Sequence, residues 1–100
     1  MTNKLSVNKL IDIFTNYEET YNDQAIQCEY EISVLENAND EEKKDRDYSK
    51  RMNYLWSSRK RNLYLARLHH EFASRLKEHV LPEDRQRTYS PSEMINLLNN

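Results

Sequence analysis

The sequence contains no glycine, and its 100 residues include only two prolines, Pro82 and Pro91. Glycine supplies the unusual backbone conformations of tight hairpins, phosphate-binding loops and nucleophile elbows. Its absence excludes a P-loop, a dinucleotide-binding fingerprint and the nucleophile elbow of serine hydrolases. Strand-rich folds also depend on turns built from glycine and proline. The composition therefore predicts an all-α protein made of long helices.

Cysteine occurs once, at Cys28, which excludes an intrachain disulfide and a cysteine-rich zinc site. The N-terminal stretch MTNKLSVNKLIDIF has lysines but no continuous apolar run and no small-residue cleavage site, so it does not resemble a signal peptide. No segment has the roughly 20 apolar residues that a transmembrane helix needs. We therefore expect a cytoplasmic protein in a reducing compartment, without a membrane partner.

Apolar residues make up only 37% of the chain, and charged residues make up 32%. So few apolar side chains suit narrow helical stripes better than a thick globular interior. The formal net charge of −2 is unevenly divided. Residues 1–49 hold five lysines and arginines against twelve acids, and residues 50–100 hold ten against five. The chain is therefore an acidic half followed by a basic half.

One helical face continues through the first half of the chain. At about 100° per residue, ten residues of this segment fall within an arc about 120° wide. They are Val7, Leu10, Ile11, Phe14, Tyr17, Tyr21, Ala25, Cys28, Ile32 and Leu35. Ser6 is a suitable N-cap for this segment. The pattern predicts a helix at about 6–37 with one buried stripe.

A polar segment at about 38–47 interrupts this pattern, which resumes at about 48–80 and stops before Pro82. Two helices of matched length predict an antiparallel, coiled-coil-like hairpin over residues 1–81. One continuous bent helix is the alternative, because DEEKKDR within the polar segment is itself a good helix former.

The last segment, SPSEMINLLNN, follows a polar linker at 82–89 and predicts a short helix within 90–100. Ser90, Pro91 and Glu93 have the spacing of a capping box with proline at the first helical position. A helix of this length is unstable alone in water. It must dock either on its own hairpin or in a groove of a partner.

The second long helix has a further apolar row that lies away from its main stripe. One neighbouring helix cannot cover both surfaces, so we expect self-association, with a second copy completing a helical bundle. The C-terminal helix offers another apolar face. The residues predicted to bind a protein partner are Met52, Trp56, Leu63, Met94, Ile95 and Leu98.

Basic residues are concentrated in the second long helix, around SSRKRNLYLARLHHEF. They could form a solvated face and pair with the acidic first helix. Alternatively they could bind nucleic-acid phosphates while Tyr54, Trp56 and Tyr64 stack on bases. The residues predicted for this alternative are Arg51, Arg59, Lys60, Arg61, Arg67 and Arg75.

His69 falls within the apolar stripe of the second helix, close in angle to Asn62. We interpret the two as buried polar residues that fix the register of the hairpin. No HExxH motif or paired ExxH spacing is present, so no metal site is predicted. The carboxylates have no second element that could hold two of them across a cleft. We expect no catalytic residue, no cofactor and no small-molecule substrate.

These patterns predict a non-enzymatic helical protein–protein interaction module that forms a homo-oligomer. An adaptor, an inhibitor or an assembly subunit would suit this description. Nucleic-acid binding through the basic second helix is the alternative function. A structural spacer, in which the length of the hairpin is itself the function, is a third hypothesis.

Overall fold

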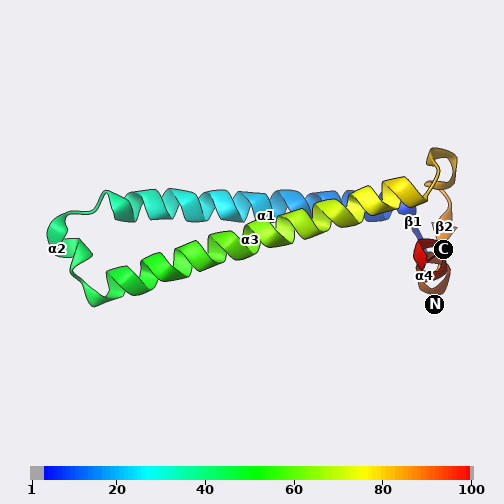
Figure 1. The fold of residues 1–100 in the computed structure, drawn as a ribbon. Coiled ribbons are helices and arrows are strands. Elements are labelled where there is room, and N and C mark those ends of the chain that lie inside the picture. Colours follow the sequence, from blue (N-terminus) through cyan, green and yellow to red (C-terminus); the bar gives the residue numbers. More distant parts are fainter. Residues whose placement is uncertain (1–3, 100) are drawn as a thin grey trace. The chain divides into compact units, whose positions relative to one another are not determined.

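The fold is an antiparallel helical hairpin with a short C-terminal helix, seen in a computed structural model that describes residues 4–99 (Figure 1). For Leu98 only the backbone is described. The elements in chain order are β1 (Leu5–Ser6), α1 (Val7–Glu36), α2 (Asp40–Lys43), α3 (Arg46–His79), the 3-10 helix η1 (Pro82–Asp84), β2 (Thr88–Tyr89) and α4 (Pro91–Asn99).

The hairpin reverses through a polar connection that contains the one-turn helix α2. Residues 37–39 leave the helical conformation, so the continuous bent helix is excluded. The side chain of Asn39 accepts a hydrogen bond from the Glu42 backbone N–H at 2.8 Å, and its amide donates to Glu42 Oε1 at 3.1 Å. This reciprocal cap starts α2 without a glycine.

Side-chain caps also mark the starts of α1 and α4. Ser6 Oγ accepts a hydrogen bond from the Lys9 N–H at 3.0 Å, as expected of an N-cap. At α4, Glu93 N–H donates to Ser90 Oγ and Ser90 N–H donates to Glu93 Oε1, both at 3.3 Å. The pKa of Glu93 is lowered, mainly by a hydrogen bond with the side chain of Ser90 and to a smaller extent by one with the backbone of Ser90. The predicted capping box is therefore formed.

The chain divides into two compact units. Unit 1 consists of Met1–Glu18 and Arg67–Asn100, and unit 2 consists of Glu19–Ala66. Each unit contains part of α1 packed against part of α3.

Unit 1 has a core to which α4 contributes. The buried residues are Val7, Ile11, Ala73, Leu76, Val80 and Met94, with Leu10, Phe14, Tyr89 and Leu97 packed against them. The segment before α4 is not the simple linker that we expected. It contains η1 and β2, and β2 pairs antiparallel with β1. The all-α prediction is therefore correct for the architecture but misses a two-residue ladder.

Arg85 ties the segment after α3 to both long helices. Its side chain donates from Nη2 to Lys77 O at 2.7 Å and from Nε to Val80 O at 3.1 Å. Its carbonyl accepts a hydrogen bond from the Asn8 N–H at 2.9 Å. The two side-chain bonds use carbonyl groups in the last turn of α3 and directly after it, where the helix itself supplies no donor.

Unit 2 has a thin core. Cys28, Ile32 and Leu55 form its buried cluster, and Leu35 and Met52 pack against it in part. Two ion pairs join the helices at its edges. Arg51 Nη2 lies 2.8 Å from Glu31 Oε1, and Arg59 Nε lies 2.7 Å from Glu29 Oε1. Because all four side chains are substantially exposed, each pair contributes less than about 1 kcal/mol.

Candidate interaction surfaces

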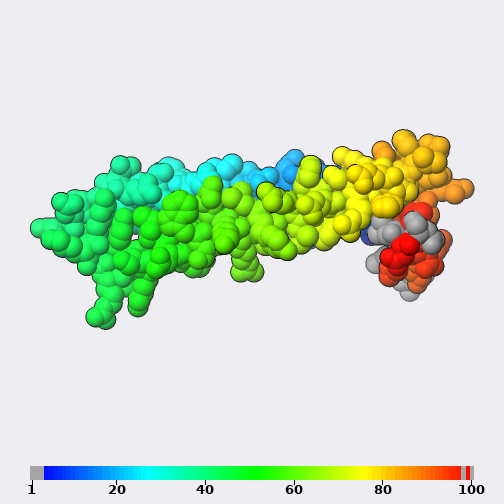
Figure 2. All heavy atoms as spheres, in the orientation of Figure 1, coloured from blue at the N-terminus to red at the C-terminus, as the bar shows by residue number. Residues whose placement is uncertain are grey.

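The predicted apolar row of α3 divides between the core and the surface. Met52 is half-buried against the unit 2 core, whereas Trp56 is 48% exposed and Leu63 is 37% exposed. Trp56 and Leu63 together form what we call the Trp56 surface. Figure 2 shows the side chains at the start of α3, in green, at the surface of the molecule.

Trp56 borders a shallow groove of about 240 Å³ in unit 2, lined by Glu29, Ile32, Ser33, Glu36, Trp56 and Arg59. The guanidinium carbon of Arg59 lies 5.7 Å from the centroid of the Trp56 ring, within the range of a cation–π interaction. Arg59 also pairs with Glu29. The indole is thus supported from one side while nearly half of the residue stays in solvent.

A second apolar row, which we did not predict, lies on α1. Ile26 is 61% exposed, Tyr30 is 65% exposed and Val34 is 55% exposed. We call these three residues the α1 outer row. Successive members are four residues apart, so they lie one above the other on the helix surface. At about 100° per residue, Tyr30 is about 160° from Cys28, on the side away from the core.

The spacing of this row is visible in the sequence. The prediction for the first helix rests on the residues within one arc, which form the buried stripe, and leaves the opposite arc out. Ile26, Tyr30 and Val34 stand on that opposite arc at positions i, i+4 and i+8. Apolar residues at this spacing are the signal that could have identified the row.

The C-terminal helix docks on its own hairpin, which leaves little of the predicted partner face. Met94 is 7% exposed within the unit 1 core, and so it is not available to a partner. Ile95 remains 59% exposed. The side chain of Leu98 lies outside the described residues.

The six basic residues of α3 that were predicted to bind nucleic acid fall into two groups. Arg51 and Arg59 are engaged by acids of α1, as the charge division of the sequence suggests. The other four are exposed and form no ion pair among the described residues; they are Lys60 and Arg61 in unit 2 and Arg67 and Arg75 in unit 1. Tyr54 and Tyr64 of unit 2 are 62% and 64% exposed.

Asn62 and His69 lie in different environments. Asn62 is 9% exposed in unit 2, and its amide nitrogen donates to Ser58 O at 2.9 Å within α3. His69 is half-buried in unit 1, with its ring centroid 5.2 Å from that of Tyr17 and 5.7 Å from that of Phe72. The bond that Asn62 makes within its own helix gives no support to the predicted register role.

The neighbouring histidine, His70, makes a contact across the helices of unit 1. Its Nδ1 lies 3.1 Å from Glu18 Oε2. Glu18 is the acid at the edge of the buried stripe of α1, so the contact joins the two helices at that edge. The contact is an ion pair only when His70 is protonated, because a neutral imidazole carries no charge.

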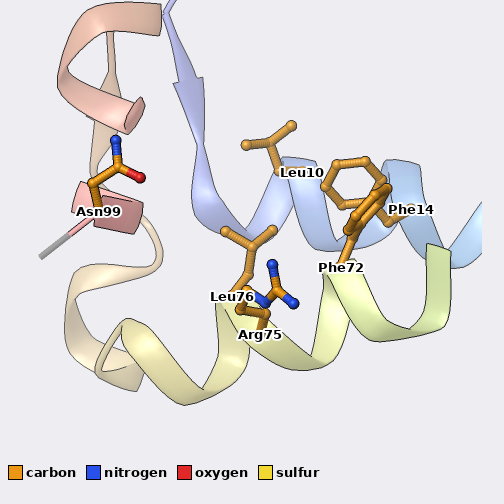
Figure 3. Close-up of a pocket in the computed structure, with 6 residues that line it drawn as sticks. All are labelled: Leu10, Phe14, Phe72, Arg75, Leu76 and Asn99. Carbon is orange, nitrogen blue, oxygen red and sulfur yellow. The ribbon is translucent and has the colours of Figure 1, made fainter. Parts of the chain in front are cut away.

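Unit 1 contains an apolar cavity of about 360 Å³, lined by Leu10, Phe14, Phe72, Arg75, Leu76 and Asn99. Phe14 from α1 and Phe72 from α3 lie together, and Asn99 of α4 lies across from them (Figure 3). The ring centroids of Phe14 and Phe72 are 5.3 Å apart. Among the described residues, the lining offers one cation and one amide, and its other side chains are apolar. Such a lining suits an apolar group.

Metal sites and membrane-spanning helices are both absent from the described residues. Within residues 4–99, no group of three or more His, Cys, Asp or Glu side chains is placed to hold a metal ion. No helix in the same part of the chain combines the length and the apolar character needed to cross a membrane. Comparisons with known proteins found no match for this chain among family models, curated proteins or solved structures.

Proposed function

We propose that this chain is a non-enzymatic protein–protein interaction module, acting as an adaptor, an inhibitor or an assembly subunit through apolar faces of unit 2. One observation supports the proposal: unit 2 buries few and mostly small apolar side chains, while seven of its large ones are exposed. The buried apolar residues are Ala25, Cys28, Ile32, Leu55 and Ala66. The exposed ones are Ile26, Tyr30, Val34, Tyr54, Trp56, Leu63 and Tyr64.

Large apolar side chains that gather on a surface commonly mark a contact with another protein. Tryptophan and tyrosine are also the residues that most often carry the binding energy of interfaces. Trp56 is partly held in place by Arg59, so ordering it on binding costs less conformational entropy than ordering a free side chain. The Trp56 surface is therefore the first surface to test.

The test is affinity capture from a cell lysate, with and without nuclease, using the native chain and the double variant Trp56→Ser, Leu63→Ser. We expect proteins that stay bound in stoichiometric amount after nuclease treatment and are lost with the double variant. Tyr64→Ser is the matched control, because it removes an exposed aromatic from the same helix outside the Trp56 surface. Equal capture by the native chain and the double variant would refute the role of this surface.

Nucleic-acid binding is the second candidate function. It is favoured by four exposed bases that form no ion pair among the described residues, namely Lys60, Arg61, Arg67 and Arg75. Fluorescence anisotropy with single- and double-stranded DNA and RNA tests it. Phosphate binding would weaken steeply as salt is raised and would be lost when these four bases become glutamine. No binding in low salt would exclude this candidate.

A further inference from the structure

The two helices of unit 2 carry charges of opposite sign. No lysine, arginine or histidine occurs between Leu10 and Ala38, so every charged residue of α1 in this unit is an acid. No aspartate or glutamate occurs between Tyr48 and His70, so every charged residue of α3 in this unit after Asp47 is a base. Contact between α1 of one copy and this part of α3 of another therefore brings only opposite charges together.

The ion pairs within the hairpin use only part of this charge. Glu29 and Glu31 of α1 pair with Arg59 and Arg51 of α3. Other charged side chains of unit 2 are exposed and form no ion pair among residues 4–99, and these include Glu19, Asp23, Lys50, Lys60 and Arg61. Their charges are available to a partner.

On α1, two of these acids continue the outer row toward the N-terminus. They form a strip of exposed residues spaced by four, three and four positions, which we call the acidic strip: Glu19, Asp23, Ile26 and Tyr30. At about 100° per residue its members fall within an arc about 60° wide, on the side of the helix away from the buried Cys28. The strip is about 16 Å long.

On α3, an exposed strip has the same spacing of four, three and four positions. We call it the basic strip, and its members are Lys50, Tyr54, Ser57 and Arg61. They also fall within an arc about 60° wide and span about 16 Å of helix. Neither Trp56 nor Leu63 belongs to this strip. The two strips therefore match in length and in spacing.

Alternating spacings of three and four are those of a coiled-coil seam, so the two strips can lie side by side, residue against residue. In the antiparallel alignment Glu19 lies opposite Arg61, and Asp23 lies opposite Ser57. Lys60, three residues after Ser57, lies at the edge of the strip near the same two acids. The acids of one strip thus meet the bases of the other at one end of the contact.

Apolar and aromatic side chains meet in the rest of this alignment. Ile26 lies opposite Tyr54, which places an aliphatic side chain against an aromatic ring. Tyr30 lies opposite Lys50, a pairing that suits a cation–π interaction. The contact therefore combines an apolar part with a charged part.

We propose that the acidic strip of one copy docks antiparallel on the basic strip of a second copy. The inference rests on the proposed function in one respect, that exposed faces of unit 2 bind protein, and it uses neither member of the Trp56 surface. Each copy carries both strips, so a pair of copies leaves one of each unused. Further copies add in the same way and form a ring or an open chain of subunits.

Other pairings of the strips are less favourable. Two acidic strips would place only acids at the interface, and two antiparallel basic strips would set Lys50 against Arg61. Like charges that face each other at an interface are unfavourable. A parallel pairing of unlike strips would set Ile26 against Ser57 and lose the contact with Tyr54.

Sedimentation velocity on the purified chain tests the proposal through an exchange of charges. Glu19→Arg and Arg61→Glu each place like charges opposite one another, so each alone should weaken association by about tenfold. The chain with both substitutions should associate like the native chain, because the pair is restored with its signs exchanged. The native chain should associate as concentration rises and dissociate with added salt.

Two further variants serve as controls. Glu19→Arg combined with Lys50→Glu should stay weakened, because Lys50 lies opposite Tyr30 in the antiparallel alignment. Trp56→Ser, Leu63→Ser should associate like the native chain. All these side chains are exposed, so the helix content seen by circular dichroism should be unchanged.

Three outcomes would overturn the proposal. They are a native chain that stays monomeric to submillimolar concentration, an exchange of Glu19 and Arg61 that does not restore association, and restoration by Lys50→Glu instead. The proposed function fails separately. If the native chain is a monomer but captures another protein through the Trp56 surface, only the pairing of two copies is wrong.

Discussion

Replacing Asn62 by leucine should stabilise the protein. Asn62 is 9% exposed within the thin core of unit 2, where its amide nitrogen donates to Ser58 O at 2.9 Å. The same nitrogen lies 3.4 Å from Ser58 Oγ. Both contacts stay within α3, so a leucine at this position breaks no hydrogen bond between helices.

The expected gain is the balance of three contributions. Burying a leucine side chain contributes about 1.5–3 kcal/mol, reduced by roughly a quarter because unfolded chains are already partly compact. Losing the amide hydrogen bond costs about 1 kcal/mol net. The higher helix propensity of leucine adds about 0.4 kcal/mol. The free energy of unfolding should therefore rise by about 1 kcal/mol, which raises Tm by about 4–8 °C in a domain of this size.

Thermal unfolding followed by circular dichroism measures this change. Native and variant chains are compared at one protein concentration, because self-association would raise the apparent stability. Asn53→Leu is the control, since Asn53 is exposed on the same helix and should gain only the propensity contribution of about 0.4 kcal/mol. A lower Tm for Asn62→Leu would refute the reasoning and restore the register role, with a bond from Asn62 to α1.

Two further predictions concern the core of unit 2 and the start of α4. Leu55 is 1% exposed, so Leu55→Ala should lower the free energy of unfolding by about 3 kcal/mol, and Leu63→Ala by less than about 1 kcal/mol, in urea titrations. Equal losses would contradict this. NMR titration should give Glu93 a pKa below its ordinary value of 4.5, and Ser90→Ala should return it toward that value. Because the folded pKa is the lower one, the contribution of Glu93 to α4 is present above pH 4.5 and is lost as pH falls through the folded pKa. A pKa that Ser90→Ala leaves unchanged would contradict the assigned cause.

The helices could be predicted because their signals are local and repeated. The predicted segments at about 6–37 and 48–80 compare with Val7–Glu36 and Arg46–His79 in the structure. Each depends on many apolar residues at helical spacing, so an error at one position does not alter the result. The start of α4 was equally predictable, because a capping box needs only residues three positions apart.

The hydrogen bond between Asn8 and Arg85 and the pairing of β1 with β2 could not be predicted in this way. They join residues about eighty positions apart, and each strand has only two residues, which is too short for a period of two to be seen. The burial of Met94 could not be predicted for a similar reason, because it depends on where the short helix docks. The short helix had two possible docking surfaces, and only the fold shows that it uses its own hairpin.

The candidate surfaces were predictable in part. The sequence showed an apolar row away from the main stripe of α3, and two of its members, Trp56 and Leu63, are exposed in the structure. The third member, Met52, is half-buried against the core of unit 2. The division of charge indicated ion pairs between the helices, but it could not say which arginines form them. That depends on register, which places Arg51 and Arg59 beside acids and leaves Lys60 in solvent.

The backbone of residues 4–99 contains no residue with positive φ. Every described position, including those in the turns, thus uses a conformation that almost any amino acid can adopt. Chain reversal is specified by side chains such as Asn39, Ser90 and Arg85. Such a chain can change at most positions without backbone strain, and a single substitution at a cap can move the end of a helix. The backbone itself therefore restricts few positions of the sequence, and the hairpin depends on its caps and its buried residues.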